Sequence, residues 1–158
     1  MKISIITIVL MLSTLQLSAE ENLTLKFRTL FEEAANNETS ANTLNSLTAQ
    51  YSTASKAIYL GYKGISEMML CNYTANVYKK LSYFNSGKKN LEDAIKQDPT
   101  NIELKFLRFC IQKNTPSFLG YNDNIKSDEV EINKYIADLN SDIALVTFIK
   151  LNKAKIKN

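Results

Sequence analysis

The chain has 158 residues and a formal charge of +3, with 45% apolar and 22% charged residues. This composition is typical of a globular domain with a hydrophobic core and excludes an intrinsically disordered chain. The charge is too small for the basic face of a nucleic-acid-binding protein, so we expect no nucleic-acid partner. Because the chain contains no His, it excludes Ser-His-Asp and Cys-His catalysis and any imidazole metal site.

The N-terminus has the layout of a secretory signal peptide. Lys2 precedes an uncharged, mostly apolar run over residues 3–15, and the small residue Ala19 precedes Glu20. We therefore predict a signal peptide over residues 1–19 and export to the periplasm or the medium. The alternative is a buried N-terminal core helix. The run is too short to span roughly 30 Å of hydrocarbon, and no later run is longer, so we expect no stable membrane insertion after cleavage.

The rest of the chain predicts one all-α domain over residues 20–152, followed by a basic, frayed tail over residues 153–158. Four Gly and two Pro are too few for the many turns of a β-sandwich or barrel. Apolar residues recur at helical spacing, and the linkers are short, so we expect an antiparallel bundle or a short α-solenoid of six to seven helices. Six predicted helices span about residues 22–36, 44–51, 55–71, 74–98, 102–113 and 141–151, and one more begins near residue 127.

Three glycines mark close packing or a possible break. Gly61 and Gly64 lie on one stripe of the third predicted helix, where small residues let a neighbouring backbone approach, so we expect the closest helix–helix contact there. The fourth helix either breaks near Gly87 or continues through it. We favour one long helix, because the periodicity does not slip at Gly87.

Several polar residues are expected to cap helices, and one loop is expected to pack on the core. The predicted N-caps are Thr74, Thr100 and Ser127, with Thr100 and Glu103 forming a capping box. After Pro116, the apolar side chains of the segment 118–121 are expected to tuck back onto the core.

The segment 68–101 resembles a tetratricopeptide repeat. Leu91, Ala94 and Pro99 follow one another at the intervals of the second helix of that family, Tyr78 stands at its earlier Tyr, and Gly87 stands at its small residue. The resemblance implies stacked helix pairs with an open, peptide-binding face. Residues 79–121 also resemble a group of small exported bacterial helical proteins of unknown function, which implies a helical fold and no particular activity.

Two cysteines and a set of polar and aromatic side chains are the candidate functional residues. Cys71 and Cys110 either form a disulfide, as exported proteins often do, or serve as small core hydrophobes. Tyr combines an apolar ring with a polar tip, so we regard Tyr59 and Tyr62 as candidates for binding. A second set of candidates is the polar stripe of the most apolar helix, which either forms a solvated face or lets Arg108 pair with a carboxylate of a neighbouring helix. That stripe consists of Lys105, Arg108 and Gln112.

The acidic residues give no metal or catalytic signature. The segment 122–128 lacks the central Gly and the spacing of a calcium loop, and adjacent acidic pairs elsewhere point to different helix faces. We expect no metal and no cofactor. The favoured function is that of an exported, non-enzymatic interaction or structural protein that binds an envelope protein or peptide. The alternative is a small envelope enzyme with a carboxylate-based site in a helical cleft.

Overall fold

The computed structural model describes the backbone of residues 5–156 and the side chains of residues 20–156. This part of the chain forms seven α-helices and two 3-10 helices and no strand, which confirms the predicted all-α fold. The elements are α1 (Ile5–Ala34), α2 (Glu38–Thr48), α3 (Ala57–Met69), η1 (Leu70–Tyr73), α4 (Val77–Gln97), α5 (Ile102–Asn114), η2 (Ser117–Leu119), α6 (Ile125–Ala137) and α7 (Ile143–Lys153).

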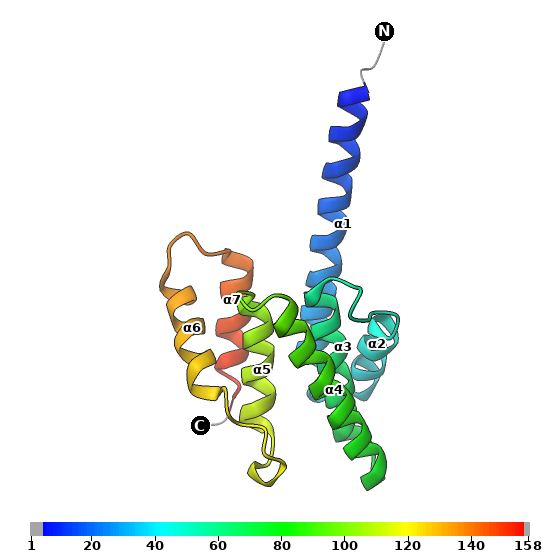
Figure 1. Ribbon diagram of the computed structural model, residues 1–158, viewed down its shortest axis with the longest axis vertical. Coiled ribbons are helices and arrows are strands. Elements are labelled where there is room, and N and C mark those ends of the chain that lie inside the picture. The colour runs from blue at the N-terminus through cyan, green and yellow to red at the C-terminus, as the bar shows by residue number, and fades with distance from the viewer. Residues whose placement is uncertain (1–4, 157–158) are drawn as a thin grey trace.

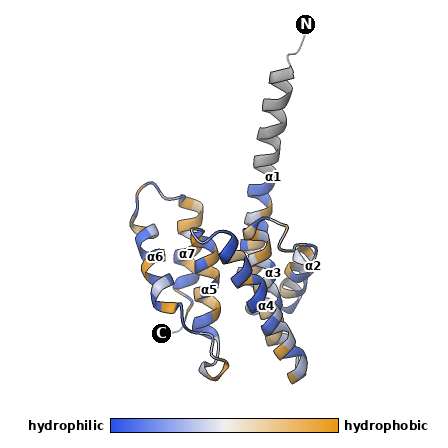
Figure 2. Ribbon diagram, in the orientation of Figure 1, coloured by the Kyte–Doolittle hydropathy of each residue, from blue (hydrophilic) through white to orange (hydrophobic). Residues whose placement is uncertain are grey.

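The helices form two neighbouring groups around one core (Figure 1). Helix α2 packs between α1 and α3, and α4 packs along α3, while α5 packs on α6 and α7. Helix α5 also contacts α3 and α4, so it joins the two groups. Figure 2 shows hydrophobic and hydrophilic positions alternating along most helices, as expected when each helix buries one stripe.

Helices α3 and α4 cross at two glycines, as the small-residue stripe predicts. A Cβ atom on Gly64 would lie 2.6 Å from the backbone oxygen of Gly87, and one on Gly87 would collide with the backbone oxygen of Gly64. Helix α4 runs without interruption through Gly87, which confirms the predicted long helix. The glycines therefore set the distance between the two helix axes, because neither backbone can move away without opening the core.

Replacing Gly87 with alanine tests this crossing. The added methyl group meets backbone atoms rather than a flexible side chain, so we expect Gly87→Ala to lower the free energy of unfolding by about 1–3 kcal/mol. The gain in helix propensity, about 1 kcal/mol, offsets only part of this loss. Urea denaturation followed by circular dichroism measures the change. Asn85→Ala, an exposed position of the same helix, is the matched control, and an equal effect in both variants would contradict the packing argument.

The structure corrects three predicted N-caps, two of them by a shift to a capping asparagine. Asn76 caps α4 instead of Thr74, accepting a hydrogen bond from the Lys79 amide at 3.0 Å. Asn101 caps α5 instead of Thr100, so the capping box is absent and the Glu103 side chain points into the core. Helix α6 begins after Asn124, one turn before Ser127. Asparagine is as good an N-cap as serine or threonine, and the neighbouring threonines lie one or two residues too early.

The two ends of the described chain also differ from the predictions. Helix α1 begins at Ile5 and continues through the predicted cleavage position, whereas the apolar periodicity placed its start near residue 22. Residues 1–4 of the predicted signal peptide lie outside the described residues. At the other end Lys153 is the last residue of α7, and Ile156 packs against the core, so this part of the tail is not frayed. Residues 157–158 lie outside the described residues.

Helix α5 is the centre of the fold. Every residue from Glu103 to Cys110 is buried, including three with charged side chains. Apolar side chains of α5 pack on both groups of helices: Leu104 meets Gly61 of α3, and the Phe106 ring lies edge-on to Phe148 of α7 at 5.6 Å between centroids. Such a helix needs partners for its buried charges, and these partners determine where the neighbouring helices lie.

Candidate binding groove

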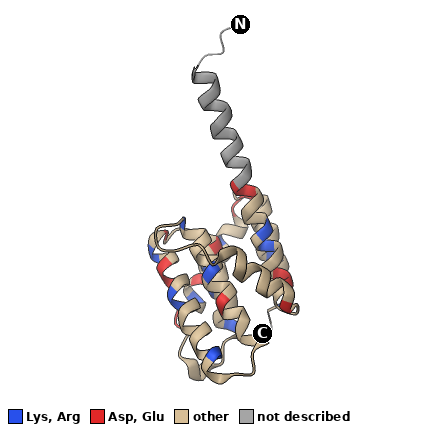
Figure 3. Ribbon diagram, turned by 90° about the vertical axis from the view of Figure 1, so that its right-hand side faces the viewer, with Lys and Arg blue, Asp and Glu red and all other residues tan. Residues whose placement is uncertain are grey.

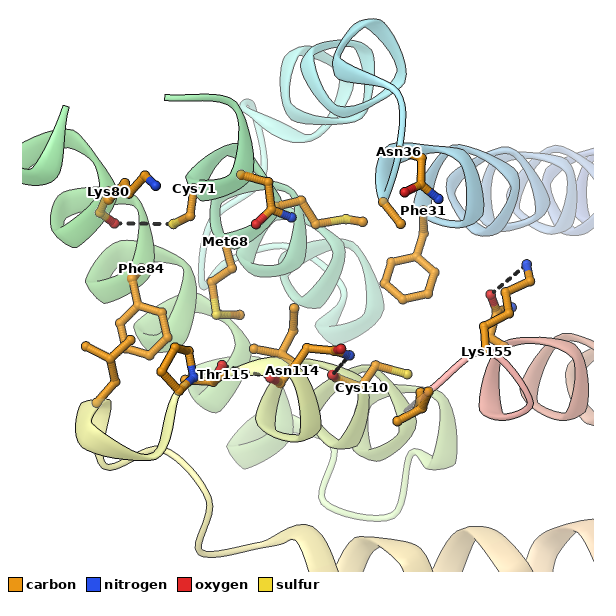
Figure 4. Close-up of a pocket in the computed structure, with 18 of the residues that line it drawn as sticks. Phe31, Asn36, Met68, Cys71, Lys80, Phe84, Cys110, Asn114, Thr115 and Lys155 are labelled. Atoms are coloured by element: carbon orange, nitrogen blue, oxygen red, sulfur yellow. Dashed lines mark hydrogen bonds between the residues drawn. The ribbon is translucent and has the colours of Figure 1, made fainter. Parts of the chain in front are cut away.

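The described surface contains a groove of about 1120 Å³, which we call the apolar groove. Its walls come from the ends of four helices, α1, α3, α5 and α7, from the first half of α4, and from η1 and η2. The side chains used below are Phe31, Glu32, Met68, Met69, Val77, Lys80, Leu81, Phe84, Cys110, Phe118 and Lys155. Figure 4 shows several of them converging on the hollow from separate helices.

The floor of the groove is apolar and polarizable. Phe31, Met68, Met69 and Cys110 are buried at its base, and the Phe84 ring is half-buried beside them. Methionine side chains are unbranched and flexible, so they adjust to ligands of different shape. The floor therefore suits an apolar ligand and offers no charged group to a reacting substrate.

Large apolar side chains stand exposed along the rim of the groove. Val77 is 73%, Leu81 50% and Phe118 84% exposed, and all three line the hollow. The prediction that the loop after Pro116 tucks onto the core is correct for Tyr121 but wrong for Phe118. The short 3-10 helix η2 turns the Phe118 ring outward, and Tyr121 takes the inward position instead. Several large, exposed apolar side chains around one hollow are typical of a surface that associates with another molecule.

The charged side chains of the groove lie at its edges. Glu32 accepts a hydrogen bond from the Asn152 amide at 2.9 Å and lies 4.0 Å from the Lys155 ammonium group. Lys80, on the opposite wall, is exposed and makes no ion pair with the described residues. The edges of the groove thus carry two lysines and one carboxylate that is already bound.

Cys71 and Cys110 both line the groove, and both are free thiols in this structure. The Cys71 thiol points toward the Lys80 carbonyl, 3.3 Å away, and the two sulfurs point in different directions in Figure 4. Burial raises the pKa of both thiols, so both are neutral at physiological pH and neither is an activated nucleophile. A disulfide between them stays a prediction, which the mass of the alkylated, unreduced protein tests.

The polar stripe of α5 is buried rather than open to a ligand. Arg108 forms a two-point ion pair with Asp128 of α6, at 2.8 and 2.7 Å, and also reaches Glu92 of α4 at 3.0 Å. Of the two alternatives for the stripe, Arg108 therefore follows the pairing with a neighbouring helix rather than the solvated face. Lys105 pairs with Glu131 of α6. Although burial opposes its charge, the carboxylates raise the pKa of Arg108 above its ordinary value, so the guanidinium group stays charged.

Gln112 and Tyr59, two other predicted binding residues, also contact the protein itself. The Gln112 amide donates to Asn124 at 3.4 Å, and its buried oxygen has no hydrogen-bond partner among the described residues. The half-buried Tyr59 ring packs against Tyr51 and Phe27. Neither side chain lines the apolar groove, so the groove and the predicted binding residues are separate parts of the molecule.

Tyr62 belongs to a second buried network, on the other face of α5. Its hydroxyl donates to Glu103 at 2.5 Å, and the same carboxylate accepts two hydrogen bonds from Arg28 of α1, at 2.8 and 2.7 Å. Tyr62 is completely buried, so its predicted role at a binding surface has no support from its position. Glu103 was expected at a helix cap. The sequence signal that it belongs inside is that apolar residues surround it on all sides.

The Tyr62 phenol is expected to make stability fall at high pH. Burial, and then the Glu103 carboxylate, raise the pKa of Tyr62 well above its ordinary value of 10.0. Because the folded state holds this proton more tightly than the unfolded state, the stabilisation is complete below about pH 10 and is lost as the pH rises from there. We expect the urea concentration at the midpoint of denaturation to decrease as the pH is raised from about 10 to about 11.5. In Tyr62→Phe we expect this decrease to be less steep. Equal slopes would contradict this assignment; a residual slope is expected because the pKa of Tyr121 is raised too.

The described residues contain no cluster placed to hold a metal ion, and the apolar groove contains no pair of acids. No group of three Cys, Asp or Glu side chains among them is placed to hold a metal ion. Glu92 and Asp128, which do come close together, both face Arg108. Within the apolar groove Glu32 is the one carboxylate among the lining residues. The pair of opposed acids that the enzyme alternative requires is therefore not found along this groove.

The helices described by the structure include none that is long and apolar enough to cross a membrane. No family model, no curated protein and no solved structure matches this chain. The function is therefore argued from the apolar groove and its surroundings.

Proposed function

We propose that this chain is an exported, non-enzymatic helical binding protein whose apolar groove takes an apolar segment of a partner polypeptide. The observation that carries the proposal is the exposure of Val77, Leu81 and Phe118 around an apolar floor. Burying one such side chain contributes about 1.5–3 kcal/mol, so the three together offset much of the cost of association, which is about 4–15 kcal/mol.

The size and openness of the groove favour a polypeptide ligand. Pockets for small molecules typically enclose about 300–1,000 Å³ and bury most of their ligand. The apolar groove is larger, at about 1120 Å³, and exposed side chains form its rim. Grooves of this kind, with flexible methionines at the base, suit the apolar face of another chain.

The ligand surface proposed here differs from the one expected from the sequence. The tetratricopeptide resemblance implies an open face that presents Tyr and Lys or Arg to an extended peptide. In the structure Tyr62, Lys105 and Arg108 are buried, whereas Val77, Leu81 and Phe118 are exposed. The exposed groove therefore supports binding through apolar contacts. The export of the chain rests on its N-terminal sequence, Lys2 followed by the apolar run 3–15.

Photo-cross-linking in cells tests the proposal. A photoreactive phenylalanine analogue is placed at Leu81 or Phe118, both exposed at the rim, in the full chain expressed in its own host. We expect a discrete cross-linked polypeptide at both positions. The matched control is Leu139, which is 100% exposed and lies outside the groove. The same adducts at Leu139, or none at Leu81 and Phe118, would overturn the proposal, and the N-terminal sequence of the recovered protein tests export in the same experiment.

A further inference from the structure

The charges around the apolar groove have an uneven distribution that bears on the chemistry of its ligand. From Val77 to Leu91, helix α4 carries four lysines and no acid. One of them, Lys80, lines the groove and is exposed without an ion-pair partner among the described residues. Figure 3 shows acidic and basic positions interspersed over other helices, such as α1, whereas the stretch of α4 from Val77 to Leu91 has basic positions only.

The opposite edge does not neutralise this charge. Glu32 is the lining carboxylate there; it accepts a hydrogen bond from Asn152 and forms a salt bridge of 4.0 Å with Lys155, so its charge is directed to Lys155 rather than to α4. Lys155 itself is 61% exposed in its side chain, so its charge also reaches the solvent at the edge of the groove. The apolar floor thus lies between a lysine on α4 and a lysine after α7, and a ligand with carboxylates on both sides of an apolar stripe would complement it.

The backbone of the groove favours a helical ligand over an extended one. The lining segments of α1, α3, α4, α5 and α7 are helical, so most of their amides and carbonyls are bonded within their own helices. An extended peptide would find no strand edge to pair with and would leave its own backbone groups unpaired in an apolar environment. Two of the four lining asparagines, Asn114 and Asn152, already donate to groups of this chain. An α-helix carries its own backbone hydrogen bonds and presents only side chains.

We infer that the occupant of the apolar groove is an acidic amphipathic α-helix of a partner protein. Its apolar stripe lies on Met68, Met69 and Phe84 under the rim side chains, and its Glu or Asp residues face Lys80 and Lys155. This inference rests on the proposed function and adds the charge and conformation of the ligand to it.

Two designed peptides of opposite charge test the inference. Both have leucines at positions i, i+3, i+4 and i+7 of a helix; one has glutamates on its polar face and the other has lysines. Their affinities for the protein purified from its host are measured by fluorescence anisotropy at low and high salt. We expect the acidic peptide to bind at least about tenfold more tightly, with an advantage that shrinks at high salt.

Variants of the protein separate the charge from the apolar contact. The double change Lys80→Glu and Lys155→Glu is expected to weaken binding of the acidic peptide by about tenfold. Lys134→Glu, at an exposed position near the end of α6 and outside the groove, is the matched control and is expected to leave the affinity unchanged. Leu81→Asp is expected to weaken the binding of both peptides, because it places a carboxylate at the apolar rim.

The outcomes distinguish this inference from the proposed function. If the basic peptide binds as tightly as the acidic one and Leu81→Asp weakens both, the acidic ligand is wrong and the apolar groove remains a polypeptide-binding site. Palmitate serves as a third probe. If palmitate binds, Leu81→Asp weakens that binding and neither peptide binds, an acyl chain is the occupant and both proposals are wrong. If no probe binds, the inference is overturned, and the cross-links at Leu81 and Phe118 decide the proposed function separately.

Discussion

Replacing Arg108 with methionine is expected to lower the free energy of unfolding by about 3–5 kcal/mol. The change leaves Asp128 as a buried carboxylate without its two-point partner, and it removes the contact with Glu92 as well. Methionine fills much of the volume of the arginine stem, so the loss reports the charge rather than a cavity. Urea denaturation at neutral pH, followed by circular dichroism, measures the effect.

Two further variants show whether the loss comes from the unpaired carboxylate. Adding Asp128→Leu to Arg108→Met removes that carboxylate, and we expect the double variant to recover much of the lost stability. Lys126→Ala, at an exposed position of α6, is the surface control and is expected to change the stability by less than about 0.5 kcal/mol. A double variant no more stable than Arg108→Met would show that the ion pair is not the cause.

The second large effect is expected at Glu103, on the other face of α5. Its carboxylate is the shared acceptor of Arg28 from α1 and of Tyr62 from α3. Glu103→Leu leaves the arginine charge and the phenol hydroxyl without this partner, so we expect a loss of about 3 kcal/mol or more. Thermal and urea denaturation measure it.

A matched variant at the same position separates the charge of Glu103 from its shape. Glu103→Gln keeps the size of the side chain and one acceptor oxygen, so we expect a loss about half as large as that of Glu103→Leu. Equal losses in the two variants would indicate that the carboxylate charge accounts for the whole effect. Losses below about 0.5 kcal/mol in both would show that the network around Arg28 does not stabilise the fold.

The sequence predicted the helices, because the spacing of apolar residues along a helix can be recognised within a short stretch of the chain. The spacing passed through Gly87 unbroken, and the helix does so too. That Arg108 has a partner was predictable only as one of two alternatives, the other being a solvated face. Which residues supply the partner was not, because Glu92 and Asp128 approach Arg108 only when α4 and α6 pack on α5.

The apolar groove could not be predicted, because its residues come from segments far apart along the chain. Phe31 and Ile156 line it together although most of the chain separates them. An isolated apolar residue such as Phe118 has the same local pattern whether it points inward or outward, and only the geometry of η2 turns it out. Tyr62 shows the opposite error. Its polar hydroxyl suggested a position at the surface, but in the core this hydroxyl donates a hydrogen bond to Glu103.

Helix α5 carries one ionised network toward α1 and α3 and another toward α4 and α6. A fragment that ends before α5 would lose the α5 side chains that its own charged groups contact. A fragment that begins with α5 would lose the partners that α1, α3 and α4 supply. We therefore expect limited proteolysis to yield no stable half-molecule: once a protease opens the chain at the turn before α5, the remaining pieces should be degraded together.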